Sequence, residues 1–197
     1  MELSRLKDQQ LVEKFVRGDK QCMQELINRH KDKVYTYILL IVKNPHVADD
    51  LFQDTYIKVI NSLRKGKYKD EGRFVSWVIR IAHNLTIDYF RKSKNQNTYS
   101  NDDGEVDLFN SPKYSDNTVE DKMVDEQTVN DVRYLIDKLP KDQKQVVLMR
   151  HYGEMSFKEI AEQTGVSINT ALGRMRYALI NMRKTMEENN MHKAYFS

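Results

Sequence analysis

Apolar residues recur at helical spacing along most of this chain, and no segment alternates apolar with polar residues as a β-strand does. The first ninety residues hold three such stripes, over residues 23–42, 47–63 and 74–85. Asn44-Pro45 separates the first two, because proline disfavours helical conformation in the residue before it. Three helices with facing apolar stripes can bury one small core. The pattern therefore predicts an all-α fold.

The helical spacing stops near Ser93 and resumes at Val129. Residues 101–127 hold nine acids and two bases, a charge of −7, which leaves +10 on the rest of a chain whose net charge is +3. A segment so poor in apolar side chains cannot bury a core, and we expect it to stay flexible. This charge separation suggests a polyanionic partner, although a solvated acidic loop explains it equally well. We predict two small helical domains, over 1–94 and 128–186, an acidic linker over 95–127 and a tail over 187–197.

A helix-turn-helix pattern lies near the end of the chain. Ser156 and Glu159 have the spacing of a capping box, in which each side chain accepts a hydrogen bond from the other residue's backbone N–H. Gly165 suits the left-handed turn that ends a helix, Val166 can fill the core, and Ser167 can cap the next helix. This order is what a short perpendicular helix pair requires. The apolar stripe expected along the last helix is Ile168, Leu172, Met175, Leu179 and Met182.

The second helix of this pair carries polar side chains suited to DNA, and no acid occurs from Ser167 to Met186. Arginines and amides match base edges and phosphates, and such a helix can enter the major groove. Cap, glycine, spacing and charge together favour DNA binding over a structural helix pair whose arginines are only solvated. The residues expected to contact duplex DNA are Ser167, Asn169, Thr170, Arg174 and Arg176.

An acidic and amide face opens the second of the three predicted N-terminal helices. It consists of Asp49, Asp50, Gln53 and Asp54, which lie on one side of the helix and away from Leu51. Acids are poorly suited to DNA, so a protein-docking surface would explain them in a DNA-binding chain. On the pattern alone, a solvated face that benefits from the dipole at the helix N-terminus is the commoner explanation.

The third predicted helix and the loop before it combine aromatic with basic residues, and residues 64–94 carry a net charge of +6. Single-stranded DNA is bound in this way, by aromatic stacking on bases and by cations along the backbone. Phe74 and Trp77, taken by themselves, are more typical of a core. The candidate residues for single-stranded DNA are Lys67, Arg73, Trp77, Arg80, Asn84, Arg91 and Lys92.

Several function classes are disfavoured. The N-terminus lacks the apolar stretch of a signal peptide, no apolar run approaches the roughly 20 residues of a membrane span, and the single Cys22 fits a reducing compartment. We therefore expect a cytoplasmic protein without membrane insertion. The histidines show no metal-ligand spacing, and neither a phosphate-binding glycine loop nor a nucleophile motif occurs. We expect no enzymatic activity, no metal and no cofactor.

Three stretches resemble the extracytoplasmic-function (ECF) group of sigma-70 family RNA polymerase sigma factors. They are ADDLFQDTYIKV (48–59), GRFVSWVIRIAHNLTIDYFRK (72–92) and LPKDQKQVVLMRHYGEMSFKEIAEQTGVSINTALGRMRYAL (139–179). The resemblance implies a sigma region 2-like first domain and a sigma region 4-like second domain, with the linker threading along polymerase channels. One departure is Leu172-Gly173, where many relatives have a basic residue and serine before the arginine equivalent to Arg174.

The resemblance also implies a role for each candidate face. The acidic face would dock on the β′ clamp helices of core RNA polymerase, whose β subunit is also an implied partner. Residues 64–92 would open the −10 element of promoter DNA, with Asn84 contacting the unpaired strand, and residues 167–182 would read the −35 element. An anti-sigma factor is a further implied partner. The alternatives are a polymerase-independent helix-turn-helix regulator and, less favoured by the basic surfaces, a helical adaptor without a DNA role.

Overall fold

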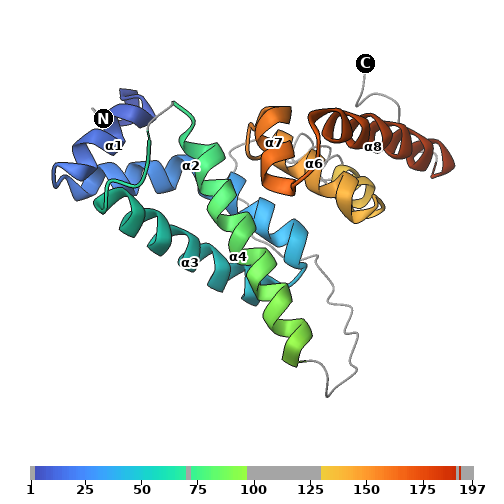
Figure 1. The fold of residues 1–197 in the computed structure, drawn as a ribbon, viewed down its shortest axis with the longest axis horizontal. Coiled ribbons are helices and arrows are strands. Elements are labelled where there is room, and N and C mark those ends of the chain that lie inside the picture. Colours follow the sequence, from blue (N-terminus) through green and yellow to red (C-terminus); the bar gives the residue numbers. More distant parts are fainter. Residues whose placement is uncertain (1–2, 70–71, 97–129, 190, 192–197) are drawn as a thin grey trace, which may run out of the picture. The chain divides into compact units, whose positions relative to one another are not determined.

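The computed structural model describes residues 3–69, 72–96, 130–189 and 191. All regular structure in these residues is helical, which confirms the predicted fold class for the described part (Figure 1). The chain divides into two compact units, residues 1–108 with 152–154 and residues 109–151 with 155–197. From residue 97 onward the predicted acidic linker lies outside the described residues, as do residue 190 and residues 192–197 of the predicted tail.

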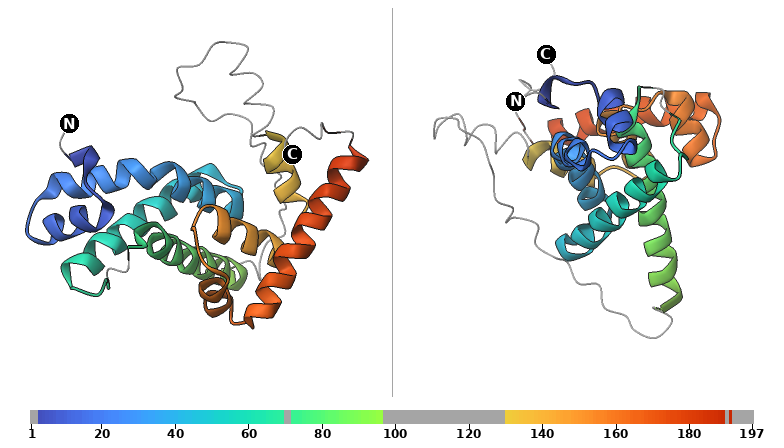
Figure 2. Two further views of the ribbon diagram at one scale, coloured as in Figure 1. Left: turned by 90° about the horizontal axis from the view of Figure 1, so that it is seen from above. Right: turned by 90° about the vertical axis from the view of Figure 1, so that its left-hand side faces the viewer.

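The first unit is a bundle in which α2 packs against α1, α3 and α4, and α3 also packs against α4 (Figures 1 and 2). Its core is built from the predicted stripes, with Leu26, Ile38 and Val59 fully buried. The elements are a 3₁₀ turn η1 (Leu3–Arg5), α1 (Asp8–Val16), α2 (Lys20–Val42), α3 (Pro45–Arg64) and α4 (Phe74–Gln96).

The sequence pattern missed α1 as a separate element. This helix has nine residues and contributes only Leu11, Val12 and Phe15 to the core. A stripe of three apolar residues is too short to establish a helical period. The signal that could have marked the break is Gly18-Asp19, since Gly18 has φ 113° and the Asp19 carboxylate accepts the Gln21 N–H at 3.0 Å as the N-cap of α2.

Asn44-Pro45 separates α2 from α3, as predicted. Helix α2 ends at Val42, and Lys43 adopts a left-handed conformation. The side chain of Asn44 then accepts the Val47 N–H at 3.2 Å and caps α3. Pro45 is the first residue of α3, where its fixed φ fits the helix and its missing N–H costs nothing. The dipeptide therefore both ends one stripe and sets the direction of the next.

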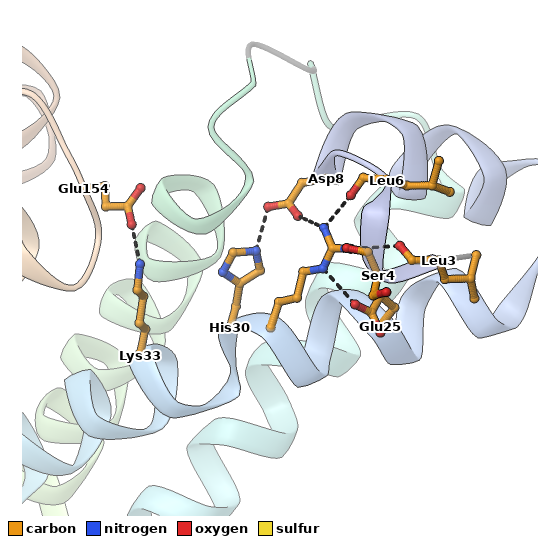
Figure 3. A network of polar contacts seen from close by, with 9 residues as sticks. Leu3, Ser4, Leu6, Asp8, Glu25, His30, Lys33 and Glu154 are labelled. Atoms are coloured by element: carbon orange, nitrogen blue, oxygen red, sulfur yellow. Dashed lines mark hydrogen bonds and ion pairs between the residues drawn. The ribbon is translucent and has the colours of Figure 1, made fainter. Parts of the chain in front are cut away.

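A polar network fixes the N-terminal turn to α2 (Figure 3). The Arg29 guanidinium donates to the carbonyl oxygens of Leu3, Ser4 and Leu6, at 2.8, 2.9 and 2.6 Å. It also contacts the carboxylate of Asp8 at 3.1 Å, while His30 Nε2 lies 2.6 Å from the second oxygen of Asp8. The hydrogen bond with His30 and the charge of Arg29 lower the pKa of Asp8 against the opposing effect of its partial burial.

Cys22 lies in the core of the first unit. Its side chain is 0% exposed, and burial together with the nearby Asp19 carboxylate raises the pKa of the thiol. Tyr37 and His83, also buried, share a hydrogen bond of 2.9 Å between the Tyr37 hydroxyl and Nδ1 of His83. This bond joins α2 to α4 in the core.

The second unit packs α6 (Lys141–His151) and α7 (Phe157–Thr164) against the long α8 (Ile168–Glu188), which runs without interruption in Figures 1 and 2. Residues 130–137 are also helical, and Leu135 and Ile136 are buried. Helices α4 and α8 end at Gln96 and Glu188, each two residues beyond the predicted domain ends.

The apolar stripe predicted for α8 was wrong by about one helix position. Ile168, Leu172 and Leu179 are 41–46% exposed, and only Met182 of the predicted five is buried. The buried residues of α8 are instead Ala171, Ala178, Met182 and Met186. Helix α8 approaches its neighbours through small and flexible side chains, so its large apolar residues do not mark the core side.

Among the described residues, no helix is both long enough and apolar enough to cross a membrane.

Candidate nucleic-acid and protein interfaces

The acidic face of α3 is exposed, as the sequence pattern indicated. Leu51, Thr55 and Val59 are buried against the bundle, so the side chains of Asp49, Asp50, Gln53 and Asp54 lie in solvent. Asp49 differs from the others because it lies beside Tyr35, where burial of the Tyr35 hydroxyl and the neighbouring Asp49 carboxylate raise the pKa of that hydroxyl. Asp50, Gln53 and Asp54 are therefore the members most available to a partner.

Ile57 is a member of this face that sequence reasoning missed. It follows Gln53 and Asp54 by four and three residues, which places it on the same side of α3, and its side chain is 57% exposed. An exposed isoleucine beside acids gives a protein partner apolar surface to bury, which charge alone does not offer. The spacing of Ile57 from Gln53 and Asp54 could have revealed it, but apolar residues were considered only as candidates for the core.

One stripe of α4 gathers most of the candidates for single-stranded DNA. Trp77, Arg80, Asn84 and Arg91 are separated by three, four and seven residues, so they lie on one side of the helix over about 21 Å. Asn84 and Arg91 are exposed, whereas Trp77 and Arg80 are half-buried. Asp88 lies in the same stripe and forms an ion pair of 3.5 Å with Arg91. Lys92 is exposed at the edge of this stripe.

The loop before α4 adds cations and a second aromatic ring. Lys67 and Arg73 are exposed on either side of residues 70–71, which lie outside the described residues. The ring of Tyr68 lies 4.5 Å from Trp77 and 6.1 Å from Phe74, measured between centroids. A core position was favoured for both Phe74 and Trp77. Phe74 is 2% exposed and belongs to the core, whereas Trp77 is only half-buried. Sequence reasoning missed Tyr68, although its place within a basic loop was a signal.

The helix-turn-helix has the caps that the sequence predicted. Ser156 Oγ accepts the Glu159 N–H at 3.3 Å, and the Glu159 carboxylate accepts the Ser156 N–H at 2.8 Å. Gly165 ends α7 in a left-handed conformation with φ 68°. Ser167 then caps α8 by accepting the Thr170 N–H at 3.0 Å. Val166, expected to fill the core, is only half-buried.

The predicted duplex-contact residues are placed unequally on α8. Ser167, Asn169, Thr170 and Arg176 are exposed. Arg174 is half-buried, and its guanidinium donates to the Asp142 carboxylate of α6 at 2.6 Å. Sequence reasoning missed Asp142 because it lies 32 residues away and no local spacing connects the two. The exposed Arg183 and Lys184 extend the basic surface toward the end of α8.

Comparisons with known proteins match both parts of the chain to one family. The family model for Sigma-70 region 2 matches residues 26–96, and the model for Sigma-70 region 4 matches residues 130–176. The chain is 26% identical to the ECF RNA polymerase sigma factor SigW of Bacillus subtilis, over 90% of this chain and 95% of SigW. It is 28% identical to the ECF RNA polymerase sigma-E factor of Haemophilus influenzae, over 86% of this chain and 90% of that factor.

Two solved structures have a similar fold. One is CnrH in complex with the cytosolic domain of CnrY, with a TM-score of 0.62 and 18% identity over 93% of this chain and 99% of CnrH. The other is the sigma factor RpoE of Bartonella quintana in complex with the anti-sigma factor NepR, with a TM-score of 0.60 and 14% identity over 83% and 96% of the two chains. From the two family matches and these relatives, the chain belongs to the ECF group of the sigma-70 family and is a promoter-directing sigma factor of RNA polymerase.

Proposed function

We propose that the chain divides the work of initiation among three helical faces. The exposed acids of α3, with Ile57, dock on the clamp helices of the polymerase β′ subunit. The Trp77–Arg91 stripe of α4, with the basic loop before it, holds the unpaired strand of the −10 element. The α7–α8 pair reads the −35 element as duplex. The observation that carries this proposal is that each face offers exposed side chains with the charge that its partner requires: acidic on α3, and basic on α8 and on α4 with the loop before it.

The α4 stripe is suited to melting. A base that leaves the stack costs a few kcal/mol, and a pocket that stacks and hydrogen-bonds the base offsets this cost. Trp77 contacts the rings of Tyr68 and Phe74 and is only half-buried, so we propose that it stacks on a base without first becoming ordered. Arg80, Asn84 and Arg91 extend along the path that the strand backbone would follow.

The division into two units also suits promoter binding. Each unit alone offers a modest DNA surface, and core polymerase tethers the two, which raises the effective concentration of the second after the first has bound. We propose that domains over 1–94 and 128–186 act in this way through the linker over 95–127. We also propose that the protein acts in the cytoplasm, because its proposed partners are core polymerase and promoter DNA.

An anti-sigma factor is the second partner that we propose. CnrH and the RpoE of Bartonella quintana, which share this fold, were solved with the cytosolic domain of CnrY and with the anti-sigma factor NepR. A protein that covers the α3 face or the exposed side of α8 would block polymerase or promoter DNA. Catalysis is not part of the proposed role.

Run-off transcription with purified core polymerase tests the proposal. Core polymerase with the chain should start transcripts at discrete sites on fragmented genomic DNA of the producing organism, whereas core polymerase alone should not. Permanganate should then modify unpaired thymines near each start site. A polymerase-independent regulator would instead bind duplex DNA tightly by itself and form no complex with core polymerase; that result, or the absence of discrete starts, would overturn the proposal.

A further inference from the structure

Gly173 lies in the second turn of α8, where a glycine is unfavourable. Glycine has no side chain to restrict the backbone, so it loses more conformational entropy than alanine when a helix forms. It therefore destabilises a helix interior. Gly18, Gly66, Gly72 and Gly165 all have φ between 64° and 113°, a conformation that other residues rarely adopt. Gly173 is helical, so its backbone conformation gives no reason for a glycine.

Packing within the protein gives no reason either. A Cβ atom built on Gly173 meets no heavy atom within 4 Å among the neighbouring described residues. Neither α6 nor α7 therefore approaches this point closely enough to exclude a methyl group. An alanine would fit the folded chain and would favour the helix.

The position of Gly173 on α8 indicates what approaches it instead. Successive residues of a helix turn by about 100°, so Gly173 shares a side with Asn169, Arg176 and Ile180. That side is opposite the buried Ala171 and Ala178. Asn169 and Arg176 are exposed, and their side-chain types pair with adenine and guanine edges in the major groove. Gly173 thus leaves a gap at the centre of the outward face, between two residues suited to reading bases.

We propose that Gly173 lets base-pair edges of the −35 element come against the main chain of α8, and that it thereby sets promoter selectivity. The inference rests on the proposed function of the α7–α8 pair. Asn169 and Arg176 are seven residues apart, about 10 Å along the axis, which corresponds to roughly three base-pair steps of 3.4 Å. Gly173 faces the middle of that span, where a side chain would hold the helix away and keep Asn169 and Arg176 from the base edges.

Gly173→Ala and Gly173→Leu form a graded test. Alanine and leucine both favour helices, so each variant should unfold at a higher temperature than the wild type, by roughly 4–8 °C in the transition of the second unit. Their side chains differ in size, so an effect of bulk on DNA should grow from alanine to leucine. The first measurement is therefore thermal unfolding of the full chain, which shows that any loss of activity does not arise from a damaged fold.

The second measurement is selectivity in the assembled holoenzyme. A promoter is chosen from the start sites that the wild-type holoenzyme uses, its −35 region is randomised, and the transcribed templates are sequenced. Gly173→Ala should reduce transcription from the wild-type −35 sequence about tenfold, and Gly173→Leu should reduce it further. The preference should change at one or two adjacent base pairs near the middle of the element.

The outcomes separate this inference from the function on which it rests. If the wild-type holoenzyme shows no −35 preference, the proposed role of α7–α8 fails. If the wild type shows a preference and both variants share it at equal strength, the inference about Gly173 fails while that role stands. A uniform loss across all templates would indicate that Gly173 faces polymerase or the DNA backbone, and would also overturn the inference.

Discussion

Helices α3 and α8 are nearly equal in length, and each follows a residue whose side chain caps it, but they use their apolar residues in opposite ways. On α3 the large residues Leu51, Val59 and Leu63 are buried, and its polar face is outside. On α8 the small residues Ala171 and Ala178 are buried, whereas Leu172 and Leu179 are exposed. The spacing of large apolar residues therefore predicts the buried side of a helix only where those residues, and not alanines, contact the neighbouring helices.

The difference bears on function because it leaves the two helices with different outward surfaces. The α3 surface is acidic around a single isoleucine, whereas the α8 surface mixes arginine, amide and apolar groups around Gly173. If α3 meets polymerase and α8 meets DNA, substitutions on the two helices should separate the two activities.

The largest effect should come from reversing charge on α3. Asp50→Arg with Asp54→Arg should weaken association with core polymerase at least about 100-fold, because like charges placed across an interface cost several kcal/mol. Co-elution with core polymerase on a sizing column measures this. Both side chains are exposed, so the melting temperature should not change.

Glu13→Arg with Asp32→Arg is the matched control, since it makes the same change of charge at exposed positions on α1 and α2. This control should bind core polymerase as the wild type does. Retained co-elution of the α3 variant, or equal loss by both variants, would remove the docking role from α3.

On α8 the corresponding test concerns the pair formed by Arg174 and Asp142. Arg174→Ala should lower −35-dependent transcription about tenfold, the loss of one charge-assisted contact, while core binding is spared. Asp142→Ala should lower it less. Because the two side chains are joined at 2.6 Å, the double variant should be no worse than Arg174→Ala alone.

Run-off transcription from a wild-type promoter and from one with a scrambled −35 element measures both effects. Additive losses in the double variant would show that Asp142 does not act by positioning Arg174. Unchanged promoter activity of Arg174→Ala would remove this arginine from the DNA contacts.

A smaller effect is expected from the apolar part of the α3 face. Ile57→Ala should weaken core binding about fivefold, since a partly exposed aliphatic side chain buried by a partner contributes on the order of 1 kcal/mol. Val16→Ala on α1 is the control, because Val16 is 54% exposed and Ile57 57%. Titration of fluorescent core polymerase compares the two, and equal affinities would confine the docking surface to the charged residues.

The smallest effect is expected on the stability of the first unit at low pH, where the contacts of Asp8 with Arg29 and His30 weaken. The lowered pKa of Asp8 means that its carboxylate stabilises the first unit fully above its ordinary value of 3.8, and that this stabilisation is lost as the pH falls through the lower folded value. Asp8→Asn should therefore lose less stability than the wild type between pH 5 and pH 2.5. Thermal unfolding across that range should show this difference, and Asp32→Asn, at an exposed position of α2, should follow the wild type.

Local signals in the sequence predicted much of the fold and of the candidate site. Asn44-Pro45, the Ser156–Glu159 box and Gly165 each act within a few residues, and the structure confirms all three. Asp50, Gln53 and Asp54 were expected in solvent because they oppose a stripe of large residues, and they are exposed.

The features that sequence reasoning missed depend on packing between distant residues. The pairing of Asp142 with Arg174 joins two helices, and the contact between the tilted rings of Tyr68 and Trp77 joins a loop to a helix. The prediction of the apolar side of α8 was wrong because the packing of α6 and α7 against α8 decides which of its residues are buried. The side that packs there includes the small residues Ala171 and Ala178. The spacing of residues along the sequence does not show which distant residues meet or how closely two helices approach.

The burial of Cys22 has a practical consequence for labelling. It is the single cysteine of the chain, its side chain is 0% exposed, and the raised pKa of its thiol disfavours the thiolate that reacts with maleimides. A cysteine introduced at an exposed site such as Lys184 would therefore be the one thiol that reacts readily in the folded protein. A single fluorophore could then report on α8 during promoter search with the native core left unaltered.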